Sequence, residues 1–305
     1  MFKEKKSKKV GSIAVPFLIT IFIGLLIVGG AMFYVYKTFF DKEEELEEPP
    51  PRTGITMATA EDSHTILLIL DERGNEKIDK QCSSTYVIMR SIPHKKKLLF
   101  IGVPSNSISM IDGTQQRLRD VYDRGGASAA KDFISNTLNV DIDRYIVFDS
   151  KSFQRACEIF GNIKAYPVDA EISNFKGDGS LQSMSAEQIE TYVTYSLFKR
   201  KEYDRAINSA NILRYLVNGT TGERIADGLE RYFEEIINMT VSDITAVDFD
   251  KRKNAIKYMF NYGDGEGFAL SIFIDGEVAG NDFIPNTDYI KNLPDEYFAD
   301  ESEES

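Results

Sequence analysis

The chain has 305 residues, a formal net charge of −12, two cysteines and two histidines. Its acidic residues gather at two places, since residues 41–48 hold six acids against one lysine and residues 295–305 hold six acids and no basic residue. Neither a basic stripe nor basic residues interleaved with aromatic ones occurs, which excludes a nucleic-acid-binding protein. Cys82 and Cys157 are too few for a disulfide framework, and with His64 and His94 they lack the spacing of a zinc site. We interpret both cysteines as thiols, with a disulfide as the alternative.

The N-terminal region has the charge asymmetry of a membrane anchor. Five lysines lie within residues 1–9, an uncharged and mostly apolar run covers residues 10–36, and acidic residues follow Lys37. As a helix this run spans about 40 Å, against a hydrocarbon core of about 30 Å, so it predicts a transmembrane helix. A cleaved signal peptide has a shorter apolar region, of about 7–15 residues. The positive-inside rule then predicts a cytoplasmic basic tail over residues 1–9 and an extracytoplasmic position for everything after the helix.

Residues 37–63 have the composition of a linker. The acidic run comes first, then three consecutive prolines at 49–51 and Gly54, with no hydrophobic period up to Ser63. The folded part is therefore expected to begin near His64. About 230 residues remain before the acidic tail at 295–305, enough for one large core with a small addition.

The first half of the folded part alternates strands and helices. Residues 66–70 form a continuous apolar run, typical of a strand buried on both faces, and residues 85–89 and 98–103 predict two strands joined by a hairpin turn at Pro93. A helix over 127–138, a strand over 145–148 and a helix over 153–160 ending at Gly161 follow. This alternation predicts a layered α/β domain.

The second half is predicted to be helical and then to return to strands. Ser185 and Gln188 form a capping-box sequence that begins a helix with Ile189, Tyr192, Val193 and Leu197 facing inward. Further helices are expected over about 203–217 and 222–239. Strands over 255–260 and 268–274, on either side of a glycine turn at 263–265, predict a small β-hairpin appendage within residues 241–294. A phosphate-binding loop is the alternative for these glycines, but no helix is expected after them.

At this point the order of elements resembles the LytR-CpsA-Psr family of extracytoplasmic wall-polymer transferases, also described as the cell envelope-related transcriptional attenuator domain. The resemblance covers about residues 65–213. Its motifs are Asp71-Glu72-Arg73-Gly74 after the first strand, Tyr122 with Gly125-Gly126, the strand 145–149 with Phe153, and residues 185–192 before Arg205. It implies that residues 64–240 form an α/β/α domain with a central mixed sheet, in a bacterial single-pass membrane protein.

What the family implies is a pyrophosphate site. Its members bind a polyprenyl-pyrophosphate glycan, with the lipid in an apolar cavity, a divalent cation (Mg²⁺ or Mn²⁺) held by aspartates and several arginines on the phosphates, and pass the glycan to peptidoglycan. Peptidoglycan and wall-synthesis proteins are therefore the implied partners. The chemistry is physically reasonable, because phosphoryl transfer needs positioned positive charge and guanidinium groups match phosphate oxygens in pairs.

Three residues of this chain match the family site. Asp71 and Arg73 match its first Asp-x-Arg motif, and Arg205 matches the first arginine of its later motif. The resemblance implies that all three residues bind the ligand and that Asp71 contacts the metal. It also implies that Arg73 and Arg205 are catalytic if the chain is active. The alternative is that Asp71 and Arg73 are a turn pair at a strand end and Arg205 an exposed helix residue. Tyr192, Phe133 and Phe153 are interpreted as core residues, with a lipid-cavity lining as the alternative.

Six positions depart from the family site by carrying neutral residues where the family has charged ones. They are Ser84, Ser105, Asn106, Thr194, Ser196 and Asn208. Four of these replace arginines, and since a hydrogen bond to a charged group contributes ~1.5–3 kcal/mol, their loss removes roughly 6 kcal/mol, on the order of ten-thousandfold in rate or affinity. We therefore expect a degenerate member, a pseudoenzyme that binds or scaffolds a lipid-linked wall polymer. The alternative is an active phosphotransferase with a rearranged arginine set drawn from Arg117, Arg119, Arg124, Lys199 and Arg200, which we otherwise interpret as solvated charges.

Overall fold

The computed structural model describes residues 58–73, 84–111, 113–172, 175–263 and 267–299. The predicted transmembrane helix at 10–36, the basic tail before it, most of the linker, and Cys82 lie outside these residues, so their predictions stay predictions. Within the part of the chain that the structure describes, no helix combines the length and the apolar character needed to cross a membrane.

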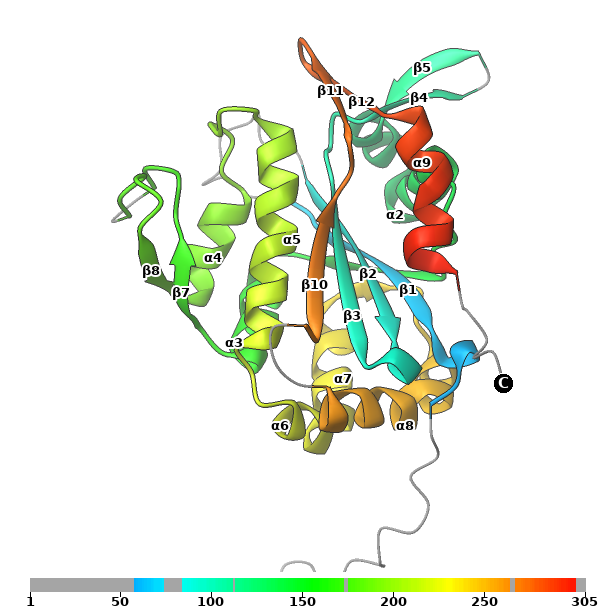
Figure 1. The fold of residues 1–305 in the computed structure, drawn as a ribbon, viewed down its shortest axis with the longest axis vertical. Helices are drawn as coiled ribbons and strands as arrows, with labels where there is room; N and C mark the ends of the chain where they lie inside the picture. Colours follow the sequence, from blue (N-terminus) through cyan, green and yellow to red (C-terminus); the bar gives the residue numbers. More distant parts are fainter. Residues whose placement is uncertain (1–57, 74–83, 112, 173–174, 264–266, 300–305) are drawn as a thin grey trace, which may run out of the picture. The chain divides into compact units, whose positions relative to one another are not determined.

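The centre of the domain is a six-stranded mixed sheet (Figure 1). Its order is β10 (Ala269–Phe273), β3 (Lys97–Val103), β2 (Thr85–Ile92), β1 (His64–Leu70), β6 (Arg144–Phe148) and β9 (Val241–Ser242). β2 is antiparallel to both β1 and β3, whereas β6 is parallel to β1 and β10 is parallel to β3. The three early strands and the hairpin at Pro93 are confirmed, and so is the mixed α/β fold.

Helices cover both faces of the sheet, and the alternation of side chains along each strand supplies both cores. Leu67, Ile88 and Ile101 lie opposite one another on adjacent strands, are fully buried, and belong to the core under α2 (Leu118–Leu138) and α9 (Thr287–Leu293). Leu70, Val87 and Phe100 point to the other face. There the helices are α3 (Ser150–Phe160), α4 (Ala186–Val193), α5 (Glu202–Asn218), α6 (Gly222–Asp227), α7 (Leu229–Met239) and α8 (Ala246–Tyr262).

Three two-stranded hairpins and three short helical turns complete the described elements. The hairpins pair β4 (Ile108–Ile111) with β5 (Thr114–Arg117), β7 (Ile163–Pro167) with β8 (Leu181–Met184), and β11 (Gly276–Ala279) with β12 (Asp282–Pro285). The turns are η1 (Ala60–Asp62), η2 (Pro93–Lys95) and η3 (Pro294–Phe298). Phe283 of β12 is fully buried and stacks on Tyr203 of α5 at 5.1 Å between ring centroids, which joins the β11–β12 hairpin to the domain.

Most predicted helices are confirmed, with earlier starts. The helix predicted over 127–138 is the second part of α2, which begins at Leu118 and breaks at Gly126, where φ is 68°. The capping box at Ser185 begins α4 as expected, with the Gln188 amide donating to the Ser185 hydroxyl. The helix predicted over 222–239 is two helices that meet at Gly228. Leu197 was predicted to face inward and is 74% exposed, because α4 has already ended at Val193.

Of the two strands predicted for the C-terminal appendage, the one over 268–274 is confirmed as β10 and the one over 255–260 is wrong. Residues 255–260 lie in helix α8, whose capping box pairs Thr245 with Asp248 and whose buried residues Ala255, Met259 and Phe260 follow helical spacing. The next strand, β10, joins the main sheet beside β3. Residues 295–298 of the predicted acidic tail are part of the domain, because η3 packs on it and the Phe298 carbonyl accepts a hydrogen bond of 2.9 Å from Arg90.

The close approach of α5 to β3 depends on Gly102. A Cβ atom at this position would lie 1.9 Å from the carbonyl oxygen of Ala206, a backbone atom that cannot rotate away. We expect Gly102→Ala to lower the free energy of unfolding by about 3 kcal/mol, the upper part of the usual range for overpacking. Gly267→Ala is the matched control, since no atom lies within 4 Å of its Cβ position. Urea unfolding monitored by circular dichroism compares the two; equal stability would contradict this account of the helix–sheet contact.

Candidate functional site

The end of β1 carries a cluster around Asp71. The Asp71 amide donates to the Phe148 carbonyl of β6 at 2.8 Å, which fixes Asp71 at the C-terminal end of β1. Its carboxylate accepts hydrogen bonds from the Arg73 amide at 3.0 Å, from Arg73 Nη2 at 2.7 Å and from the Tyr122 hydroxyl at 2.8 Å. The Arg73 guanidinium lies 4.2 Å above the Tyr122 ring. Asp71, Arg73 and Tyr122 thus form one unit.

The environment of Asp71 favours its ionised form. Burial alone would raise its pKa, but the hydrogen bonds from Arg73 and Tyr122 outweigh burial and hold the pKa below its ordinary value. The Arg73 side chain is 47% exposed, and its Nη1 makes no hydrogen bond to the residues that the structure describes. Arg73 is therefore half-exposed, and Asp71 binds the Nε and Nη2 side of its guanidinium.

Arg205, on the first turn of α5, lies in the same region but is only 2% exposed. Its Nη2 forms an ion pair with Glu202, one turn earlier, and lies 3.4 Å from the Ser84 carbonyl oxygen. The Ser84 hydroxyl in turn lies 3.4 Å from Asp71 Oδ1. The structure thus brings Asp71, Arg73 and Arg205 together around Ser84, and their role in ligand binding stays a prediction.

Most of the positions that depart from the family site take part in contacts within the domain. Ser105 donates to Glu202 at 2.5 Å, and Asn106 donates to the Asn281 carbonyl at 2.8 Å, which holds the turn of the β11–β12 hairpin. Thr194 donates to the Glu190 carbonyl at the end of α4. Asn208 accepts from the Tyr166 hydroxyl at 3.5 Å, and Ser196 is half-buried after α4. These side chains therefore act as neutral packing and hydrogen-bonding groups.

The basic residues proposed as substitutes mostly have partners of their own. Arg117 pairs with Asp282 at 2.5 Å and Arg200 with Asp204 at 2.7 Å. Arg119 lies 3.8 Å from Asp120, Arg124 donates to Gln116, and Lys199 is exposed. None of these contacts is to Asp71, Arg73 or Arg205.

Sequence reasoning missed Glu202, and it missed the contact that Tyr122 makes in the site. Glu202 neutralises Arg205, and the spacing of three residues on a predicted helix is the signal that could have identified the pair. Tyr122 was part of the family resemblance, but its hydroxyl contact with Asp71 joins residues 51 positions apart, which no local pattern reveals.

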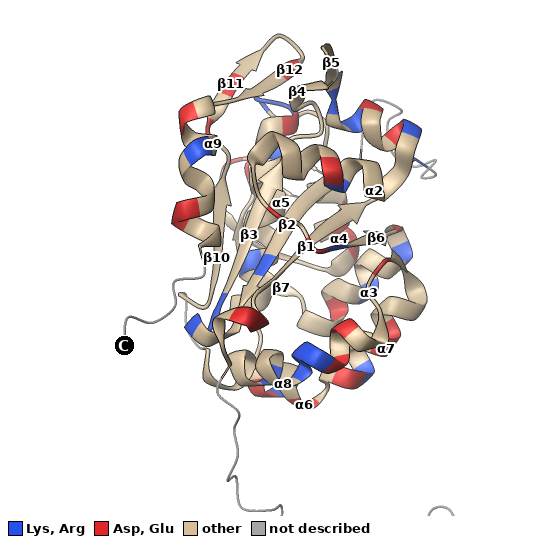
Figure 2. Ribbon diagram, turned by 90° about the vertical axis from the view of Figure 1, so that its right-hand side faces the viewer, with Lys and Arg blue, Asp and Glu red and all other residues tan. Residues whose placement is uncertain are grey.

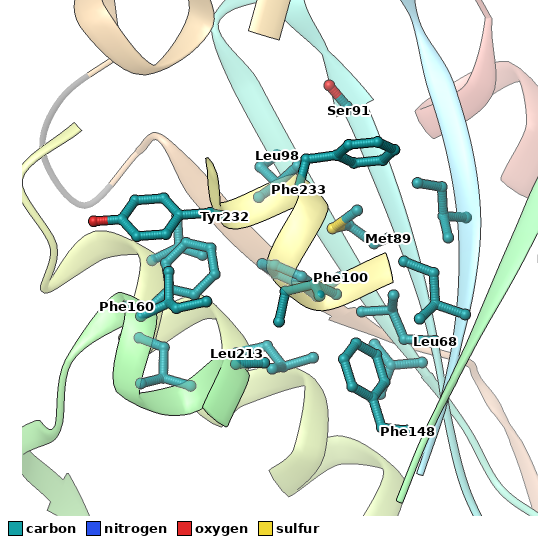
Figure 3. A pocket seen from close by; sticks show the side chains of 18 of the residues that line it. Leu68, Met89, Ser91, Leu98, Phe100, Phe148, Phe160, Leu213, Tyr232 and Phe233 are labelled. Atoms are coloured by element: carbon teal, nitrogen blue, oxygen red, sulfur yellow. The ribbon is translucent and has the colours of Figure 1, made fainter. Parts of the chain in front are cut away.

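An apolar cavity of about 320 Å³ lies between the sheet and helices α3, α5, α7 and α8. Figure 3 shows Leu68, Met89 and Phe100 of the sheet facing Tyr232 and Phe233 of α7 across it. Its lining includes Leu70 and Thr85, the direct chain neighbours of Asp71 and Ser84. One end of the cavity therefore adjoins the charged cluster.

Of the aromatic residues interpreted as core, only Phe153 lines this cavity. Tyr192 is fully buried and donates to Asp169 at 2.5 Å, and Phe133, on α2, packs against the opposite face of the sheet. The Cys157 thiol also lines the cavity, and burial raises its pKa to about 12, so it is unreactive.

Asp71 is a poor match for a divalent cation held by the protein alone. Both of its oxygens already accept hydrogen bonds, and among the described residues no group of three or more histidine, cysteine, aspartate or glutamate side chains could hold a metal ion. The expectation of Mg²⁺ or Mn²⁺ stays a prediction.

A family model and a characterised relative both match this chain. The sequence model of the LytR_cpsA_psr family matches residues 30–188. The polyisoprenyl-teichoic acid–peptidoglycan teichoic acid transferase TagU of Enterococcus faecalis is 22% identical over 269 residues, which are 85% of this chain and 86% of the relative.

Solved structures share the fold. A crystal structure from Eubacterium siraeum, described as that of a transcription regulator, has a TM-score of 0.67 at 18% identity and covers 80% of this chain and 95% of its own. Bacillus subtilis TagV has a TM-score of 0.59 at 16% identity, with coverage of 76% and 94%. TagT bound to LI-WTA has a TM-score of 0.57 at 13% identity, with coverage of 77% and 89%.

The lowered pKa of Asp71 predicts a pH-dependent contribution to stability. Because the folded-state pKa lies below the ordinary value of 3.8, the contribution is complete above that value and is lost as the pH falls through the folded-state pKa. The difference in unfolding free energy between the wild type and Asp71→Asn should therefore be largest above about pH 5 and shrink toward pH 3. Urea unfolding over this range measures it. Asp132→Asn, at an exposed position of α2, is the control, and a difference independent of pH would contradict the prediction.

Proposed function

Because the chain belongs to the LytR-CpsA-Psr family, we propose that it binds a polyisoprenyl-pyrophosphate-linked wall polymer at the outer side of the cell membrane, as a binder or scaffold without transferase activity. The observation that carries this proposal is the position of the apolar cavity, which ends at Leu70 and Thr85, directly beside Asp71 and Ser84. The apolar chain of such a lipid would therefore bind in the cavity, and its anionic head group would bind beside Asp71 and Ser84.

The cavity suits a polyisoprenyl chain because nearly all of its lining is aliphatic or aromatic. Burial of apolar surface contributes roughly 25 cal/mol per Å², so a chain of this kind gains affinity along its whole buried length. At the cavity end, Arg73 is the half-exposed cation, and Asp71 and the Tyr122 ring hold it in place. A half-exposed guanidinium can form charge-assisted hydrogen bonds with a pyrophosphate.

The relatives support the class of partner. The name of the Enterococcus faecalis relative describes a transferase that acts on polyisoprenyl-teichoic acid and peptidoglycan, and the TagT structure contains LI-WTA. For this chain we propose a glycopolymer of the same general kind as ligand, with peptidoglycan or wall-synthesis proteins as further partners.

The absence of catalysis is proposed from the charges at the site. Phosphoryl transfer is accelerated by positive charge positioned on the developing transition state. Here Arg205 is buried and neutralised by Glu202, and the positions of four family arginines carry serine, threonine or asparagine. An active enzyme would need cations such as Arg200 to leave the partners that they have in this structure.

Lipid binding is tested by mass spectrometry of lipids extracted from the purified full-length chain. We expect a polyisoprenyl-pyrophosphate lipid to copurify, and Arg73→Ala to reduce it about tenfold, because one charge-assisted contact contributes ~1.5–3 kcal/mol. Arg119→Ala is the matched control, since Arg119 contacts Asp120 and not the cluster. Absence of such a lipid from the wild type, or equal amounts in the wild type and Arg73→Ala, would refute binding at this site.

Catalysis is tested separately with lipid-linked polymer, peptidoglycan and magnesium, and with Enterococcus faecalis TagU as the positive control. We expect no transfer above background by this chain. Transfer at a rate comparable to that of the control would establish the alternative, an active phosphotransferase with a rearranged set of arginines.

The proposed location rests on the lysine-to-acid asymmetry around residues 10–36. A phosphatase reporter that is active only outside the cell, fused after Gly54, should be active in intact cells. Activity of a cytoplasmic reporter at the same position would instead place the folded domain inside the cell.

A further inference from the structure

A second pocket, the α6–α7 hollow, lies at the junction of these two helices. It has a volume of about 640 Å³ and is open to solvent. Four of its seven described lining residues are charged, and all seven lie within 221–232: Thr221, Glu223, Arg224, Asp227, Gly228, Arg231 and Tyr232. Among the described residues, only Tyr232 lines both this hollow and the apolar cavity. The hollow is therefore a separate, polar location.

Tyr232 holds the two arginines of the α6–α7 hollow. The Arg231 guanidinium lies over the Tyr232 ring, 4.9 Å from its centroid. Arg224 donates to the Tyr232 hydroxyl at 3.3 Å and to the Ile159 carbonyl at 2.6 Å. Figure 3 shows the Tyr232 hydroxyl pointing away from the other labelled residues of the apolar cavity. Both guanidinium groups are therefore positioned around one ring.

Neither arginine forms an ion pair with a described carboxylate. The neighbouring acids of α7 pair with other residues, since Glu230 binds Lys257 at 2.7 Å and Glu235 binds Arg155 at 2.5 Å. The hydrogen bond from Arg155 is the main cause of the lowered pKa of Glu235, and the charge of Arg231 adds a longer-range effect.

The two acids of the hollow, Glu223 and Asp227, are exposed and likewise form no ion pair with the described residues. Two positive and two negative side chains thus line one hollow without pairing with one another. In Figure 2 both basic and acidic positions also occur on α7. The hollow is therefore not part of a patch of a single sign.

We propose that the α6–α7 hollow binds a zwitterion, an amino acid or short peptide that carries one ammonium and one carboxylate group. Arg224 and Arg231 bind the carboxylate, because guanidinium groups match its two oxygens, and Glu223 and Asp227 bind the ammonium. The two acids repel a phosphate, and the two arginines repel an amine that has no carboxylate, so the charges favour a ligand with both groups. A volume of about 640 Å³ lies within the usual range of ligand pockets.

This site goes beyond the proposed function and does not depend on it. The lipid of the proposed function occupies the apolar cavity, whereas the zwitterion binds in the polar hollow. The Tyr232 ring lines the cavity and its hydroxyl contacts Arg224, so a zwitterion on the two arginines also restricts this ring. Occupation of the hollow therefore reaches the wall of the cavity through one residue.

The test is a ligand-observed NMR titration of the purified full-length chain with alanine and with trialanine. We expect saturable binding of at least one of these probes; tighter binding of alanine indicates a free amino acid, and tighter binding of trialanine indicates a peptide. N-acetylalanine lacks the ammonium group and alaninamide lacks the carboxylate. Each should therefore bind about tenfold more weakly than alanine, because one set of charge-assisted contacts is lost.

Two substitutions test the residues of the hollow. Arg231→Gln and Asp227→Asn should each weaken binding about tenfold, because each removes a charge-assisted contact. Lys251→Gln and Glu234→Gln, at exposed positions outside the hollow, are the matched controls and should bind like the wild type. Thermal unfolding curves verify that the variants are folded.

Arg73→Ala separates this proposal from the proposed function, since it should lose the pyrophosphate lipid and keep the binding of alanine or trialanine. Three results would each overturn the zwitterion site: no saturable binding of either probe by the wild type, wild-type affinity in folded Arg231→Gln or Asp227→Asn, or equal affinity for N-acetylalanine or alaninamide. Failure of the pyrophosphate lipid to copurify would refute the proposed function and leave this site standing.

Discussion

The burial of Arg205 is the constraint on which the charged region depends. A guanidinium that is 2% exposed requires an anion and hydrogen-bond acceptors, and Glu202 and the Ser84 carbonyl supply them. This ion pair lies on the first turn of α5, where Gly102 lets the helix approach the sheet closely. The same contacts neutralise Arg205 and leave Arg73 as the half-exposed cation of the cluster. An anionic ligand therefore meets a site with much of its positive charge already committed to the fold.

The second organising feature is the cavity, because the apolar side chains of α7 face it. None of the residues of α7 is fully buried, and its apolar side chains line the cavity: Leu229, Tyr232, Phe233, Ile236 and Ile237. A short helix gains most of its stability from packing of its apolar face. Occupation of the cavity by an apolar chain would therefore stabilise α7. The proposed ligand would therefore be coupled to the order of this helix.

The sequence predictions succeeded where the signal is local and failed where it is not. The apolar run at 66–70 and the capping box at Ser185 each carry their information within a few residues, and both elements formed as predicted. The strand prediction for residues 255–260 is wrong because six mostly apolar residues fit the strand period of two residues as well as the helical period of 3.6 residues. Over the full length from Ala246 to Tyr262, only the helical period fits. Leu197 fits the helical period of α4 but lies beyond its end.

By itself the sequence determined the early strands, the mixed α/β class and the family resemblance, and it predicted Asp71, Arg73 and Arg205 as ligand-binding residues. Only the tertiary structure decided that the Ser84 hydroxyl lies beside Asp71, that Glu202 neutralises Arg205, that β10 pairs with β3, and that an apolar cavity lies between the sheet and α7. The physical reason is that periodicity and capping act over a few residues. Burial, charge pairing and cavity shape depend on side chains brought together from positions as distant as 64 and 252.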